Sequence, residues 1–347
     1  MVTCKAQRNL CRLATIGKWY KELICNVFYI CKKYNMSSNV NTPLQPTEVS
    51  TFPDTSYVAG ASQPKIGRKS IVFTSDEGEF SMLVRNQLDR LQKVPGCGFV
   101  DLGISDGNHS QGFECSLRIH LTSTGKSLKN LKLLQLPAVV AHHSLQSYNV
   151  PSTINIAHQR QMPKGQQYNI SGESTPTNYS LGQMRSQPYM LEPILRDTSQ
   201  LIFHLGAVRA ADAPGLESSL PTGLQAEEAC QLMRYAGESD QLGFIYINTG
   251  DITTSHHTTA MLVAQIIWYT IEGRSLRVVG SPLSHEQDYT QYLVETSSGT
   301  LQFYRRNIDD RWSIKALSVE GKFIACAHEE YQSAVQGSLS NRLLYSL

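Results

Sequence analysis

Short apolar runs alternate with helical patterns through the first part of the chain's body. Residues 69–74, 99–104 and 136–141 are β-rich runs with few polar side chains. Between them, residues 80–94 carry apolar side chains at helical spacing, and residues 116–133 carry a looser version of that pattern. Strands of a parallel sheet are buried on both faces and therefore read as near-continuous apolar runs. The alternation predicts an α/β unit with a parallel sheet.

The same alternation resumes after a polar stretch. Residues 160–190 are rich in Gln, Ser, Asn, Gly and Pro, which predicts a long surface loop. The last helix of the unit is apolar almost all round, as buried helices are, and Gly273 is placed to end it. Strands and helices are expected in turn over residues 201–205, 223–235, 243–248 and 258–272.

Beyond this helix, polar and apolar residues alternate. Residues 289–294 and 301–304 read as a hairpin around a Ser-Ser-Gly turn, and residues 311–317 read as a third strand. The expected organisation is an α/β domain followed by a β-rich C-terminal extension, over residues 67–281 and 282–347.

Charge and cysteine content set the beginning of the chain apart. Residues 1–35 hold half of the eight cysteines and seven Lys or Arg against one acid, Glu22, whereas the rest of the chain has 24 basic and 28 acidic residues. The rest of the chain has no basic stripe of the kind that indicates a nucleic-acid partner. An amphipathic surface helix, a poor targeting segment and translated sequence upstream of a start at Met36 all remain open for this extension. The polar residues 36–66 are expected to be a linker.

The cysteines outside this extension are widely scattered: Cys97, Cys115, Cys230 and Cys326. Because the chain has no Cys-x-x-Cys pair, a zinc cage or a redox motif is not expected. Isolated cysteines in a large α/β chain are typical of a reducing compartment, which favours a cytoplasmic protein. No membrane span is expected, since the apolar residues 23–31 cover about half the length required.

Residues 201–215 are the most informative segment. They read as a buried strand that runs into a tight turn, and α/β proteins usually carry out chemistry at such strand ends. The segment resembles the metal-binding strand of the arginase/ureohydrolase family, Ser-x-Asp-x-Asp-x-x-Asp-Pro with Pro-Gly close behind. His204 and Gly206 occupy its two carboxylate positions, while Asp212 and Pro214–Gly215 are kept.

Other strings resemble a bacterial, Bacteroidetes-type branch of the same family, similar to formimidoylglutamases. The resemblance implies a three-layer α/β/α sandwich with a mainly parallel sheet, and a homo-oligomer that is a trimer or a hexamer. It also implies a pair of Mn²⁺ ions that turn bound water into hydroxide for attack on an amidine or guanidinium carbon. The matching strings lie in order at residues 192–197, 207–215, 223–230, 234–237, 264–269, 310–312 and 330–334.

Most ligands of such a metal pair are missing. In the first family motif His143 and Ser144 match only with a one-residue slip. The second motif is absent: residues 154–159 are either its degenerate remnant or a better match to a later string of the same branch, which would mean that a whole strand-helix unit is lost. Tyr246 and Thr249 stand near the last strand of the unit, where the branch tends to carry an acid. Without carboxylates, two divalent cations would leave large uncompensated charge.

Two functions follow from this mismatch. The leading hypothesis is a ureohydrolase-family protein that lacks its metal site, needs no cofactor and acts as a non-catalytic binding or assembly module. The alternative is a divergent metal-dependent C–N hydrolase of formimidoylglutamate-like or guanidino substrates, which would hold Mn²⁺ as the resemblance implies.

Histidines stand at several predicted strand ends. If His143, His204 and one of the pair His256 and His257 converge, they offer imidazoles for a single Zn²⁺ or similar ion. The simpler interpretation is a set of ordinary histidines that are hydrogen-bonded or solvated. The full set is His142, His143, His204, His256 and His257.

Two charged residues near the strand at 201–205 are further candidates. Asp212 is interpreted either as a turn or cap residue or as a metal ligand. Arg209 has the fork geometry to bind a substrate carboxylate, and a structural ion pair with Asp197 or Asp212 is its alternative role.

Overall fold

The computed structural model describes residues 70–104, 115–123, 138–146, 153–162, 178–252, 256–296 and 299–346. The extension and the linker expected over residues 1–66 lie outside this part of the chain. Two compact units divide the described residues between Gly280 and Ser281. Within the described ranges, no helix is both long and apolar enough to cross a membrane.

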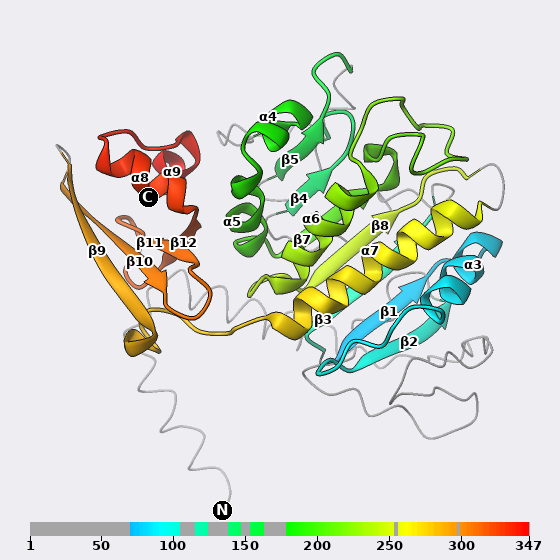
Figure 1. Ribbon diagram of the computed structural model, residues 1–347, viewed down its shortest axis with the longest axis horizontal. Coiled ribbons are helices and arrows are strands. Elements are labelled where there is room, and N and C mark those ends of the chain that lie inside the picture. Colours follow the sequence, from blue (N-terminus) through cyan, green and yellow to red (C-terminus); the bar gives the residue numbers. More distant parts are fainter. Residues whose placement is uncertain are drawn as a thin grey trace, which may run out of the picture. The chain divides into compact units, whose positions relative to one another are not determined.

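Eight strands of the first unit form a parallel sheet (Figure 1). Their order is β2-β1-β3-β8-β7-β4-β5-β6, and every neighbouring pair runs parallel. Their side chains are mostly apolar and buried, as a sheet covered on both faces requires. The predicted α/β fold with a parallel sheet is confirmed. The bounds are β1 Ile71–Ser75, β2 Phe99–Ile104, β3 Leu117–Thr122, β4 Ala138–Ala141, β5 Thr153–His158, β6 Asn178–Ser180, β7 Gln200–His204 and β8 Phe244–Asn248.

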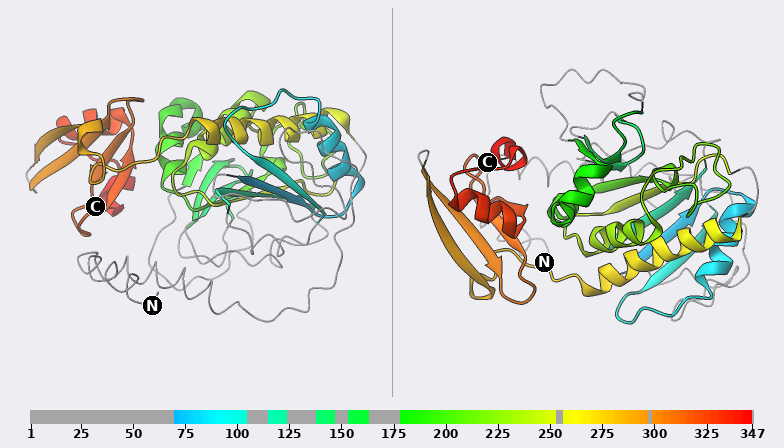
Figure 2. Two further views of the ribbon diagram at one scale, coloured as in Figure 1. Left: turned by 90° about the horizontal axis from the view of Figure 1, so that it is seen from below. Right: turned by 45° about the horizontal axis from the view of Figure 1, so that its top comes forward.

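Helices lie side by side on one face of this sheet (Figures 1 and 2). α3 packs against α7, α7 against α6, α6 against α5, and α4 against β5. The sheet and this layer are the described part of the predicted three-layer sandwich. The bounds are α3 Glu79–Leu88, α4 Leu181–Ser186, α5 Leu191–Arg196, α6 Ala226–Glu238 and α7 His257–Leu276, with 3-10 turns η3 Pro188–Met190 and η4 Leu205–Ala207.

Glycines let α6 and α7 approach each other closely. A Cβ added at Gly237 would overlap the carbonyl oxygen of Thr270, and one added at Gly273 would overlap the carbonyl oxygen of Arg234. The helix end predicted at Gly273 is wrong, since α7 continues to Leu276. This glycine serves helix packing instead of helix termination.

Two further expectations differ from the structure. The helix predicted over residues 116–133 is wrong at its start, because Leu117–Thr122 is strand β3. Its Leu, Ile and Leu alternate with Arg, His and Thr, a period of two that is typical of a strand. Residues 160–190, expected to be a loop, contain β6, α4 and η3. Ser180 accepts a hydrogen bond from Gln183 N and caps α4, a local signal that the polar composition concealed.

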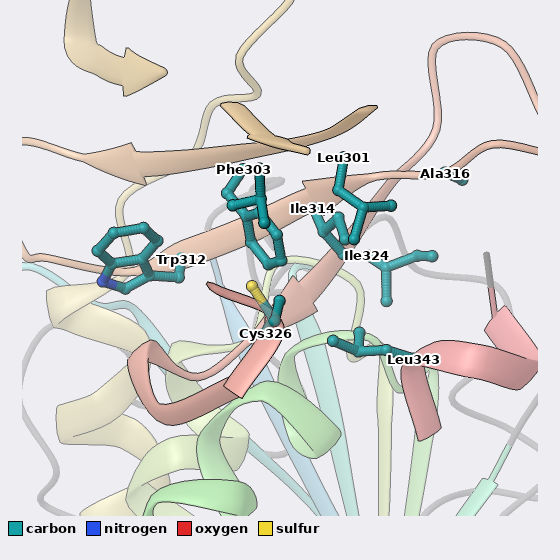
Figure 3. Packing of buried hydrophobic residues seen from close by; sticks show 10 residues of the cluster. Leu301, Phe303, Trp312, Ile314, Ala316, Ile324, Cys326 and Leu343 are labelled. Carbon is teal, nitrogen blue, oxygen red and sulfur yellow. The ribbon is translucent and has the colours of Figure 1, made fainter. Parts of the chain in front are cut away.

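The second unit carries an antiparallel sheet in the order β12-β11-β10-β9. Helices α8 and α9 follow it, and their side chains join those of the sheet in one core around Phe303 and Trp312 (Figure 3). The predicted β-rich extension is confirmed. Strand β12 was not expected, because four residues are too few for a clear alternation. The bounds are η5 Glu286–Asp288, β9 Tyr289–Thr296, β10 Gly299–Arg306, β11 Trp312–Lys315, β12 Phe323–Cys326, α8 His328–Val335 and α9 Asn341–Ser346.

Candidate functional site

Histidines gather where neighbouring strands of the large sheet end. β4 pairs with β7, and β7 pairs with β8, all in parallel. His142 and His143 directly follow β4, and His204 is the last residue of β7. Parallel strands bring their carboxyl ends to one edge of the sheet, so these three side chains meet there.

The three imidazole rings are in direct contact. The ring centroids of His142 and His143 lie 4.1 Å apart, with a tilt of 33° between the ring planes. His142 meets His204 edge to face, at a centroid distance of 4.4 Å. All three side chains are partly buried. We call these three residues the histidine cluster.

Backbone hydrogen bonds fix the ring nitrogens of two cluster members. Nδ1 of His142 accepts a hydrogen bond from the Ser144 N–H at 2.9 Å, which places the proton of the neutral ring on Nε2. Nδ1 of His143 lies 3.3 Å from the Gly206 carbonyl oxygen and donates to it. In each of these two rings, one nitrogen is therefore engaged in a hydrogen bond with the protein backbone.

Burial keeps the cluster neutral. Burial, together with the neighbouring His143, lowers the pKa of His142 from 6.5 to about 4. Burial also lowers the pKa of His143 and, far more strongly, that of His204. Among the described residues, no carboxylate is near enough to shift any of these three pKa values. Within the described residues, the three neutral rings therefore have no carboxylate beside them with which to hold a cation.

A loop fills the space beside Gly206. A Cβ added at Gly206 would stand 3.0 Å from Oγ of Ser218 and 3.4 Å from Nδ1 of His143. Leu216 of the same loop forms an antiparallel bridge with Ile252, just beyond β8. This bridge holds the loop across the strand ends, where a carboxylate at position 206 would have to lie.

These donors do not fit the Mn²⁺ pair that the family resemblance implies. Hard divalent cations need several oxygen ligands, and bridging carboxylates neutralise a pair of them. The two carboxylate positions hold His204 and Gly206. In the part of the chain that the structure describes, no group of three or more His, Cys, Asp or Glu side chains could hold a metal ion.

Asp212 and Arg209 form an ion pair at the start of α6. Nε of Arg209 donates to Oδ2 of Asp212 at 2.8 Å, and the same oxygen accepts the N–H of Ala226 at 2.9 Å. Ala226 is the first residue of α6, so the carboxylate satisfies one of the N–H groups left free at a helix start. The bond from Arg209 is the main cause that lowers the pKa of Asp212. Asp212 therefore stands as a cap and Arg209 as its partner.

His256 lies against a turn and belongs to no ring contact of the histidine cluster among the described residues. A Cβ added at Gly215 would overlap the His256 ring, and Gly215 has a φ of +89°. Thr259 Oγ1 donates to the Pro214 carbonyl oxygen at 2.6 Å. The Pro-Gly turn thus packs against the beginning of α7 and is hydrogen-bonded to it. His257 is exposed in the first turn of that helix.

A buried Asp–His pair was missed from the sequence. His120 on β3 places Nδ1 2.9 Å from Thr74 Oγ1 and Nε2 3.5 Å from Asp76 Oδ1. Burial raises the pKa of Asp76, but hydrogen bonds that involve His120, Thr122 and Ser123 outweigh burial and lower it. The pair is almost wholly buried and ties β1 to β3. The sequence did offer one signal for this pair: His120 lies in a segment whose apolar and polar residues alternate as in a strand.

Tyr246 lies in the middle of its strand, β8, and not at the carboxyl end of the strand. It packs with Val140 and Ile202, and burial raises the pKa of its phenol to about 12. The position near which an acid was sought is therefore part of the hydrophobic core.

Comparison with known proteins gives matches among solved structures alone. No family model matches the chain, and no curated protein matches it. The chain is similar to an oxidised formiminoglutamase of Trypanosoma cruzi solved with Mn²⁺, with 14% identity and a TM-score of 0.49 over 63% of this chain and 96% of that one. The similarity is one of fold.

Two other solved structures are similar at the same level. Agmatine ureohydrolase of Thermoplasma volcanium has 14% identity and a TM-score of 0.44, covering 60% of this chain and 92% of that one. Arginase from Bacillus subtilis has 12% identity and a TM-score of 0.43, covering 58% of this chain and 98% of that one.

Proposed function

We propose that this chain is a ureohydrolase-like protein that lacks the metal site of that family and acts as a non-catalytic binding or assembly module. The observation that supports this proposal best is the histidine cluster. Three neutral imidazoles contact one another at the strand ends, where the sequence resemblance calls for carboxylates around a metal pair.

The chemistry of the family explains why this difference matters. Metal-bound water becomes hydroxide near neutral pH because divalent cations stabilise the negative charge. Carboxylates hold those cations in place and offset their charge. Position 204 is an imidazole that burial keeps neutral, and position 206 has no side chain and is crowded by Ser218. Neither position supplies the charge that the reaction needs.

We also propose a cytoplasmic homo-oligomer. The described cysteines, Cys97, Cys115, Cys230 and Cys326, are all free thiols, which supports a reducing compartment. A trimer or a hexamer is the assembly that the sequence resemblance implies.

Metal analysis and thermal shift of the purified full chain test the proposal. We expect no stoichiometric Mn²⁺ after incubation, no rise in Tm with Mn²⁺ or Zn²⁺, and no hydrolysis of formimidoylglutamate, arginine or agmatine. Specific binding of an ion to the folded chain must raise its stability, so an unchanged Tm is informative. His204→Ala and the exposed His257→Ala form a matched pair for any shift that does occur.

Two results would contradict the proposal. A bound Mn²⁺ pair with amidine hydrolysis would assign the chain to the metal-dependent C–N hydrolases. A Zn²⁺-dependent rise in Tm that His204→Ala abolishes and His257→Ala leaves intact would assign a single ion to the histidine cluster.

A further inference from the structure

The small antiparallel sheet ends in a long and regular strand. β9 spans Tyr289–Thr296 and pairs with β10 through every residue without a bulge, and no described strand pairs with its other side. The opposite edge strand, β12, has only 4 residues. Proteins usually protect a long edge with a bulge, a proline or a lysine, because its free N–H and C=O groups pair readily with another chain. β9 has none of these, and its only charged residue is Glu295.

Alternate residues of β9 direct their backbone groups away from β10. The Asn307 N–H donates to the Asp288 carbonyl oxygen at 2.9 Å, one step beyond the ladder of β9 and β10. Hydrogen-bonded and non-hydrogen-bonded pairs alternate along an antiparallel ladder. The backbone groups of Gln291, Leu293 and Glu295 therefore face the open edge.

The side chains of these same residues lie on the outer face of the sheet. Val294 is buried and Tyr292 packs on the core, whereas Leu293 is 62% exposed. The partner of Leu293 across the ladder is the polar Gln302. A large apolar side chain is thus exposed at the middle of the open edge.

We propose that β9 pairs with β9 of a second copy of this chain, antiparallel, about a twofold axis at Leu293. This pairing places Leu293 opposite Leu293 of the partner and Gln291 opposite Glu295. On the core side it places Tyr292 opposite Val294 and Thr290 opposite Thr296. The two sheets would join into one, and the exposed leucines would be buried against each other.

Charge favours a second copy in this register. A twofold interface is self-complementary, so each residue must suit the residue it meets. Glu295 meets the amide of Gln291, which can donate to its carboxylate, and no like charges stand opposite each other. A register centred on Glu295 would bring two carboxylates together. One centred on Gln291 would leave Glu295 beyond the end of the partner strand. The pairing does not depend on the chemistry of the histidine cluster.

Sedimentation velocity of the full chain over a range of concentrations tests the pairing. Leu293→Lys puts two ammonium groups at the axis and should raise the dimer dissociation constant about tenfold or more. Leu317→Lys is the matched control, since Leu317 is 64% exposed and lies outside β9. It should leave the dissociation constant unchanged. If the first unit also assembles, Leu293→Lys should halve the mass of the assembly.

A second variant tests the register and does not depend on disrupting the strand. Gln291→Lys places an ammonium opposite the partner's carboxylate at position 295, twice per dimer by symmetry, and should tighten the dimer. Tightening that a further change, Glu295→Gln, removes would support the register. Equal circular dichroism and Tm would confirm that each variant is folded.

Three results would overturn the pairing. The wild-type chain remains monomeric at every concentration. Leu293→Lys has no more effect on assembly than Leu317→Lys. The β9 amides at positions 291, 293 and 295 are protected from hydrogen exchange in the monomer, which would mean that another segment of the same chain covers the edge.

Discussion

Protonation of the histidine cluster couples the stability of the first unit to pH. The pKa of His142 falls from 6.5 to about 4 on folding, so between these values the unfolded chain binds more protons than the folded one. The contribution of the neutral cluster to the free energy of unfolding should be complete above pH 6.5 and should decrease as the pH falls toward 4. The lowered pKa values of His143 and His204 act in the same direction.

Urea unfolding on both sides of pH 6.5 measures this dependence. His204→Phe keeps a ring in the cluster and removes one titrating group, so its profile should be flatter than that of the wild type. Asp76 does not interfere, because its lowered pKa lies below 3.8 and acts at more acid pH. A wild-type midpoint that stays constant through this window would contradict the neutral cluster.

Crowding around Gly206 gives a second prediction at the scale of single residues. Gly206→Ala places a methyl group 3.0 Å from Oγ of Ser218, which is tighter than ordinary packing, and should lower the free energy of unfolding by about 1–3 kcal/mol. Ser218→Gly removes the obstructing atom. The double variant should recover much of the loss, and denaturant unfolding of all four proteins gives the coupling. Additive effects would mean that Ser218 does not fill this space.

The sequence predicted the location of the candidate site better than its chemistry. His142, His143 and His204 were placed at strand ends from the apolar runs before them, and adjacent parallel strands bring them together. Ring contacts and tautomers depend on χ angles and on a backbone donor two residues away, which spacing does not report. The position of Ser218 beside Gly206 depends on a loop closed by the Leu216–Ile252 bridge, a contact between residues distant in sequence.

Helix packing in the first unit depends on two glycines. Gly273→Ala would force a methyl group into the carbonyl oxygen of Arg234 and should lower the free energy of unfolding by about 1–3 kcal/mol. Gly182→Ala on α4 is the control, since nothing lies within 4 Å of its added Cβ. In that open position alanine should raise the stability by about 0.5–1 kcal/mol. Thermal unfolding of the two variants should thus change in opposite directions, and a shared sign would contradict the close contact of α6 and α7.

Predictions for whole elements succeeded where a single period dominated. The apolar run that became β7 and the all-apolar α7 were located within a few residues. The strand β3 was not predicted, because Arg118 and His120 made its alternation look like the polar face of a helix. In the sheet, Arg118 stacks over the ring of Phe244. The helix α4 was not predicted, because six residues with one capping residue show too little helical periodicity.

The division of the chain into two compact units leads to a prediction about the whole molecule. Residues 281–347 contain a core of their own around Phe303 and Trp312, and the buried pair Glu330–Arg342 with Ser340 links α8 to α9. A fragment of these residues should show a cooperative thermal transition, although so short a chain buries a modest share of its surface. Circular dichroism and dispersed amide resonances check this result. Trp312→Ala should abolish the transition, and a disordered wild-type fragment would contradict the independence of this unit.

Trp312 also makes the chain its own optical reporter. The chain has three tryptophans, and of the two in the described residues, Trp268 and Trp312, only Trp312 belongs to the second unit, with its indole stacked on Tyr331 at 4.5 Å and on His328 at 5.1 Å. Replacing Trp19 and Trp268 by phenylalanine would leave an emitter whose intensity and wavelength depend on that stack. The opening of this unit could then be timed inside the intact protein without a label, while far-UV circular dichroism followed the secondary structure of the whole chain.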